Sequence, residues 1–118
     1  MRNKTMSHDI QTLELTKEQA QTKIDRMKRL ERLTKNRDWK VLIDDELFGE
    51  YAKQLVLLKS DPALREEGDQ KDLELEIQMV GRFRLFLQSV FQEGRMAEKS
   101  VADADAMLDE LRAEGADE

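Results

Sequence analysis

The sequence has 118 residues, with 20 basic and 26 acidic side chains, one His, one Pro and no Cys. This length predicts one small domain, and 39% charged residues with few aromatics favour exposed helices over a large globule. The lack of Cys excludes disulfide frameworks, Cys-ligated zinc and thiol nucleophiles.

Charge is divided unevenly along the chain. Residues 1–40 carry 11 basic and 6 acidic side chains, a net of +5, whereas residues 41–118 carry 9 basic and 20 acidic ones, a net of −11. The first ten residues hold no apolar segment of the kind that a secretory signal needs. The longest aliphatic run, Leu55–Leu58, is far below the roughly 20 residues that span a bilayer, so we expect a cytoplasmic protein without a membrane partner.

The first predicted element is a helix over about residues 16–35. Residues 1–15 are polar without periodicity, and we expect a flexible polar arm there. Thr16 and Gln19 have the spacing of a capping box, and Asn36, which tolerates a left-handed conformation, would end the helix. Apolar side chains recur at steps of three and four residues at Ala20, Ile24, Met27, Leu30 and Leu33.

The second predicted helix covers about residues 45–59. Residues 38–43 before it would allow a short strand, but no other segment could pair with one, so a helical turn capped by Asp38 is favoured. The acidic pair at 44–45 would cap the helix, and Pro62 would end it, because the residue before a proline avoids the helical region.

The third predicted element is a long helix over about residues 70–113, after a loop at 61–70. Ten heptad core positions in this helix carry no charge: Val80, Phe83, Leu87, Val90, Gly94, Ala97, Val101, Ala104, Leu108 and Leu111. Such a pattern is typical of a coiled coil. It would be buried either by self-association or by a bend at Gly94 that folds the helix back, and both remain open.

Together these elements predict an all-α fold, with a short helical hairpin or bundle and a long C-terminal coiled-coil-like helix. We expect one helical domain over residues 16–113 and a disordered acidic tail at 114–118. The uncharged heptad positions predict a homo-oligomer whose interface includes Val80, Phe83, Leu87, Val90, Ala97, Val101, Ala104, Leu108 and Leu111.

Residues for catalysis or metal binding are scarce. The single His, His8, lies in the polar arm, so no nucleophile has a candidate base beside it. Asp103 and Asp105 lack the Gly and distal Glu of a calcium loop. The sequence therefore predicts a protein that is not an enzyme and that uses no cofactor and no metal.

Basic residues on the first helix raise the question of nucleic acid. Lys28, Arg29, Arg32 and Lys35 lie opposite its apolar stripe, where they could contact phosphates or an acidic protein partner. The acidic pI near 4.9 and the few aromatics weigh against nucleic acid. A solvated or protein-contacting face is favoured.

Several segments resemble small helical proteins encoded by tailed bacteriophages. The run RLERLTKNRDW at residues 29–39 is similar to the first helical segment of that family, with its Asn-x-Asp-aromatic turn. A Phe/Tyr-containing helix ending in a Leu-rich stretch then corresponds to residues 48–58, followed by Asp61 and Pro62. Residues 84–98 look like part of the family's long helix, and the likeness covers about residues 29–112.

The resemblance implies a place among phage head and packaging genes, whose small helical products mostly have no assigned activity. We therefore expect a non-enzymatic, self-associating interaction protein of phage particle assembly, with a minor capsid-associated, scaffold-like or chaperone role. Its partner would be a phage structural protein, and it would act in the host cytoplasm or the virion. The alternatives are a nucleic-acid-associated accessory factor that uses residues 28–35, or a host-directed inhibitory protein.

Overall fold

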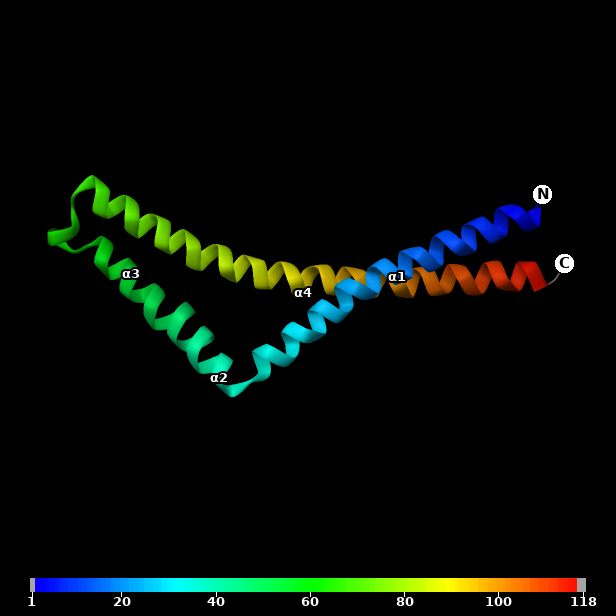
Figure 1. Ribbon diagram of the computed structural model, residues 1–118, viewed down its shortest axis with the longest axis horizontal. Helices are drawn as coiled ribbons and strands as arrows, with labels where there is room; N and C mark the ends of the chain where they lie inside the picture. The colour runs from blue at the N-terminus through cyan, green and yellow to red at the C-terminus, as the bar shows by residue number, and fades with distance from the viewer. Residues whose placement is uncertain (1, 117–118) are drawn as a thin grey trace. The chain divides into compact units, whose positions relative to one another are not determined.

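The computed structural model describes residues 2–116 and the side chains of residues 7–115. The described residues contain no β-strand, which confirms the all-α prediction with a long C-terminal helix. The elements in chain order are α1 (Arg2–Lys35), α2 (Arg37–Trp39), the π-helix η1 (Lys40–Tyr51), α3 (Ala52–Lys59), the 3-10 helix η2 (Pro62–Leu64) and α4 (Glu67–Ala116) (Figure 1). They form two compact units: a terminal unit, Met1–Arg29 with Val90–Glu118, and a hairpin unit, Leu30–Ser89.

In the terminal unit, α1 lies beside the C-terminal part of α4 (Figure 1). The two segments are antiparallel, because Glu14 pairs with Arg112 whereas the later Met27 meets the earlier Gly94. Seven apolar side chains of this unit are buried: Ala20, Ile24, Met27, Val90, Ala97, Ala104 and Leu108. Three of the seven are alanines, and short side chains at a helix contact let the two axes approach closely.

Gly94 marks the tightest point of this contact. A Cβ atom added there would lie 2.8 Å from Met27 Cγ and would overlap Met27 Cβ. The Met27 side chain therefore packs directly on the α4 backbone. Gly94 lies within α4 and does not interrupt it. The buried heptad positions of this part of α4 are covered by α1 of the same chain, so neither a bend at Gly94 nor a second copy is needed to bury them.

The beginning of α1 differs from the sequence prediction. Described residues of the expected flexible arm are helical, because α1 begins at Arg2 rather than near Thr16. Ile10 and Leu13 are half-buried and extend the apolar stripe toward the N-terminus at the same spacing. Thr16 does not cap the helix: its Oγ1 donates to the carbonyl oxygen of Thr12, 3.0 Å away, inside the helix.

Asn36 separates α1 from the next helical segment, but not in the predicted left-handed conformation. Its backbone is extended, with φ −65° and ψ 135°. Its Oδ1 accepts from the backbone N–H groups of Asp38 at 2.8 Å and Trp39 at 3.4 Å, so Asn36 is the N-cap of α2. Helical backbone then continues from residue 37 to residue 59, and no break separates residues 38–43 from the predicted second helix.

The hairpin unit places η1 and α3 against the first half of α4. The turn between them forms as predicted at Pro62: α3 ends at Lys59, and Asp61 accepts from the N–H of Ala63 at 2.9 Å. The expected loop at 61–70 is shorter than predicted, because η2 occupies part of it and α4 begins at Glu67. Gln70 Nε2 donates to the carbonyl oxygen of Leu64, 2.6 Å away, which ties the turn to α4.

The far end of α4 also extends beyond its predicted limit. The helix continues to Ala116, so the first residues of the expected disordered tail are helical. The rest of that expectation, residues 117–118, lies outside the described residues.

Substitution of the two α4 glycines tests the close approach at Gly94. Gly94→Ala should lower the free energy of unfolding by about 1 kcal/mol, because overpacking costs about 1–3 kcal/mol and the gain in helix propensity offsets about 1 kcal/mol. Gly81→Ala is the control: nothing lies within 4 Å of its added Cβ, and it should raise stability by about 0.5–1 kcal/mol. Urea unfolding followed by far-UV circular dichroism measures both. Equal stabilisation by the two variants would contradict the close contact.

Candidate protein-interaction site

The hairpin unit buries little of its apolar surface. Its buried apolar side chains are Leu30, Leu55 and Leu73. Its exposed large apolar side chains are Leu33, Val41, Leu42, Tyr51, Val56, Leu57, Leu58, Leu75, Met79, Leu85 and Phe86. In the described part of the terminal unit the corresponding set is only Leu15, Met96 and Met107. Extensive exposed apolar surface marks a site of protein interaction, so the candidate site lies in the hairpin unit.

The centre of the candidate site is a groove of about 370 Å³ between η1 and α4, which we call the hairpin groove. Its apolar lining consists of Ile43, Leu47 and Tyr51 from η1 and Met79, Val80 and Phe83 from α4, and Glu76 adds one carboxylate. Spacings of four residues on η1 and of three and four on α4 place each set on one helix face. Phe48 packs beside the groove against Phe83, with 5.7 Å between ring centroids and an interplanar angle of 37°.

A hydrogen bond joins the two walls of the hairpin groove. The Tyr51 hydroxyl donates to Glu76 Oε2, 2.9 Å away. This bond, together with the nearby negative charge, raises the pKa of the Tyr51 phenol, because ionisation would remove the donated proton and place two negative charges side by side. On the same pair of helices, Lys59 pairs with Glu74 at 3.2 Å. These exposed contacts set the register of the hairpin rather than supplying much stability.

Trp39 forms part of a second apolar surface of the hairpin unit. With Leu33, Leu42 and Ile43 it lines an open depression of about 350 Å³. The Trp39 indole N–H is buried and donates to no acceptor in the described part of the chain. A buried donor without an acceptor carries a desolvation cost of roughly 1–3 kcal/mol.

The predicted interface residues of α4 fall into two groups. Val90, Ala97, Ala104 and Leu108 are buried in the terminal unit, where Val101 and Leu111 are half-buried. Val80, Phe83 and Leu87 lie in the hairpin unit and are half-buried. The chain itself covers the four buried positions, whereas Val80, Phe83 and Leu87 lie in the unit with the larger exposed apolar surface.

The basic residues predicted to contact phosphate or an acidic partner are all exposed on α1: Lys28, Arg29, Arg32 and Lys35. The acidic side chains that α1 meets within the terminal unit pair with other bases. Lys17 pairs with Asp105, and Arg26 Nη1 donates to Glu93 Oε2 at 3.1 Å. These acidic side chains of α4 are thus paired inside one chain, with bases other than the predicted four.

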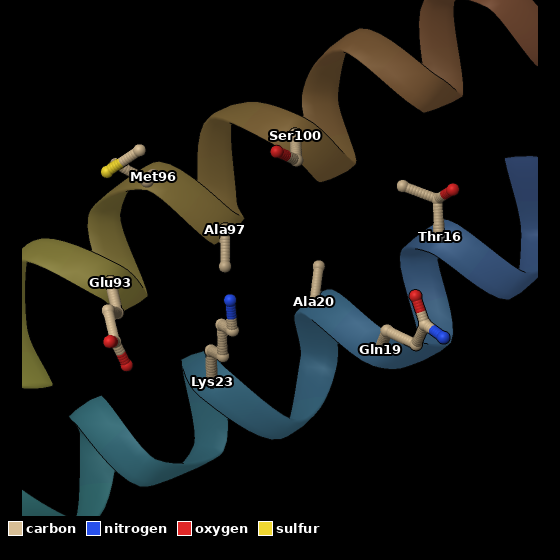
Figure 2. A pocket seen from close by; sticks show the side chains of 8 residues that line it. All are labelled: Thr16, Gln19, Ala20, Lys23, Glu93, Met96, Ala97 and Ser100. Atoms are coloured by element: carbon tan, nitrogen blue, oxygen red, sulfur yellow. The ribbon is translucent and has the colours of Figure 1, made fainter.

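The terminal unit also contains a groove of about 260 Å³ between α1 and α4 (Figure 2). Figure 2 shows Ala20 and Ala97 facing each other at its centre, with polar and charged side chains around them. The lining residues are Thr16, Gln19, Ala20, Lys23, Glu93, Met96, Ala97 and Ser100. This groove exists because two alanines meet where larger side chains would fill the space.

Within residues 2–116, no helix is both long and apolar enough to cross a membrane. The same described residues hold no group of three or more His, Cys, Asp or Glu side chains able to bind a metal ion. Comparisons of the chain with protein-family models, curated proteins and solved structures found no match. The likeness to phage head and packaging proteins stays a prediction from the sequence.

The η1 wall of the hairpin groove was not predicted as a binding surface. Ile43, Leu47 and Tyr51 recur every four residues, a signal that the predicted break at residues 44–45 obscured. The π-helical winding of η1, whose hydrogen bonds join residues five apart, keeps residues four apart close to one line. Sequence periodicity does not distinguish this winding from an α-helix.

Titration of the single tyrosine tests the bond across the hairpin groove. Glu76→Gln should lower the pKa of Tyr51 toward that of a free phenol, because the acceptor loses its charge. A raised pKa in the fold stabilises the protonated state. Its contribution to stability is therefore complete below the ordinary phenol pKa and is lost as the pH rises through the folded pKa. Tyrosinate absorbance measures the shift, with Glu74→Gln as a control of equal charge that should leave it unchanged.

Proposed function

We propose that this chain is a non-enzymatic helical interaction protein that self-associates through its hairpin unit and acts in the assembly of bacteriophage particles. The observation that carries the proposal is the contrast between three buried and eleven exposed large apolar side chains in that unit. Helices in proteins are stabilised mainly by packing an apolar face against a neighbour. Association supplies the packing that the hairpin unit lacks alone.

The terminal unit supports this choice of surface by contrast. Leu108 is 1% exposed and Val90 is 4% exposed, so a second chain could reach them only after α1 had moved away. Leu57 and Leu85 of the hairpin unit are 62% and 63% exposed and need no such step. Burial of apolar area contributes roughly 25 cal/mol per Å², so covering these side chains favours association.

The place of the protein in phage assembly rests on the sequence resemblance. An assembly factor acts by contacting other chains, which suits a protein whose exposed apolar side chains exceed its buried ones in one unit. Such a factor needs no catalytic group. Minor capsid-associated, scaffold-like and chaperone roles share this requirement.

Two double variants with equal changes of charge test self-association. In multi-angle light scattering at tens of micromolar, the wild-type chain should have a mass of two or more chains of 13.8 kDa each. Leu57→Glu with Leu85→Glu should reduce it to that of one chain, because buried unpaired carboxylates oppose association. Leu15→Glu with Met107→Glu changes side chains that are each 53% exposed in the terminal unit and should leave the oligomer intact. A wild-type monomer would overturn self-association.

The assembly role is tested separately by particle composition. In purified particles of the encoding phage, mass spectrometry should detect the chain if it is capsid-associated, and in immature particles alone if it is scaffold-like. Deletion of the gene should lower the yield of complete particles. Normal yield and normal particles after deletion would contradict an assembly role while leaving self-association untouched.

A further inference from the structure

The hairpin groove differs from the rest of the exposed apolar surface because it combines two apolar walls with an acidic border. Its η1 wall is formed by Ile43, Leu47 and Tyr51, and its α4 wall by Met79, Val80 and Phe83. The groove measures about 370 Å³, room for about two aromatic-sized side chains, since a cavity of about 150 Å³ binds benzene.

We propose that the hairpin groove binds an amphipathic helix of a partner protein, with an apolar stripe flanked by Lys and Arg. This inference goes beyond the proposed self-association and does not depend on it. A third helix laid over two antiparallel ones completes a three-helix arrangement and inserts side chains at positions i, i+3, i+4 and i+7. Met79 is 69% exposed, and its flexible thioether adapts to different apolar partners.

The charged side chains around the groove favour a partner with a net positive charge. η1 carries four acidic side chains, Asp44, Asp45, Glu46 and Glu50, and all are exposed. Its one base is Lys40, at the N-terminal end. Glu76 adds a carboxylate on the opposite wall, where the Tyr51 hydroxyl holds it in place. On α4 two exposed bases, Arg82 and Arg84, lie one turn beyond Met79 and Val80, so five acidic groups outnumber three basic ones around the groove.

The same charges disfavour a second copy of this chain in the groove. A symmetric dimer brings identical patches together, so the acids of one η1 would face the acids of the other. Like charges placed opposite each other oppose association, whereas Lys and Arg beside an apolar stripe would be attracted. The groove is therefore assigned to a basic partner, and self-association to exposed apolar side chains outside it.

Three synthetic peptides serve as probes for the full chain. The first is an amphipathic Leu/Lys helix, the second has Glu in place of every Lys, and the third is a scrambled peptide of the first composition. Isothermal titration calorimetry measures binding, and Trp39, the only tryptophan, reports it independently through its fluorescence. We expect the Leu/Lys helix to bind at least tenfold more tightly than either other peptide. Equal binding of the Leu/Lys and Leu/Glu helices, or of the scrambled peptide, would overturn the proposal.

Matched variants locate the binding. Met79→Gln should weaken the Leu/Lys helix roughly tenfold, the equivalent of about 1.4 kcal/mol, whereas Met96→Gln, at a side chain 70% exposed outside the groove, should not. Glu46→Gln with Glu50→Gln should weaken it about three- to tenfold at low salt and less at high salt. Glu98→Gln with Glu110→Gln is the control: it makes the same charge change at exposed positions of α4 outside the groove and should leave peptide binding unchanged.

Equal weakening by the groove variants and by their controls would show general attraction to an acidic protein and would overturn the proposal. Light scattering of Met79→Gln separates the two surfaces. Its mass should equal that of the wild-type chain, so a loss of peptide binding does not depend on the outcome for self-association.

Discussion

The close approach of α1 to α4 at Gly94 is the contact on which the terminal unit depends. Because no Cβ stands between them, the Met27 side chain reaches the α4 backbone, and Ala20 and Ala97 can meet on the same face. Close axes bring the flanking charges within reach, so Lys17 pairs with Asp105 and Glu14 with Arg112. The opposite charges of the two chain ends thus serve first to align α1 with α4 of the same molecule.

A different constraint governs the hairpin unit. Two helices side by side can cover only one strip of each other, and the apolar faces of η1, α3 and α4 are wider than that strip. Leu55 and Leu73 are buried in it, while large side chains on either side stay in water. We propose that association covers these side chains, and that the hairpin groove binds a partner that matches its shape and charge.

Local signals in the sequence succeeded where one residue type dictates the backbone. Pro62 ends a helix because its ring disfavours a helical residue before it, and Asp61 caps the turn at Pro62. They failed where one residue suits two environments. Thr16 fits a capping box and equally well a helix interior, where its hydroxyl bonds to a carbonyl one turn back. Asn36 can end a helix or cap the next one, and here it caps.

The sequence by itself determined that the chain is helical, where the turn at Pro62 lies, and which face of each helix is apolar. The uncharged heptad positions include the buried apolar side chains of α4 from Val90 to Leu108. Only the tertiary structure decided that α1 covers that face, that η1 winds as a π-helix, and that the groove beside Tyr51 remains open. The physical reason is that periodicity records which side of a helix avoids water, whereas the neighbour that covers it depends on contacts between residues far apart in the chain.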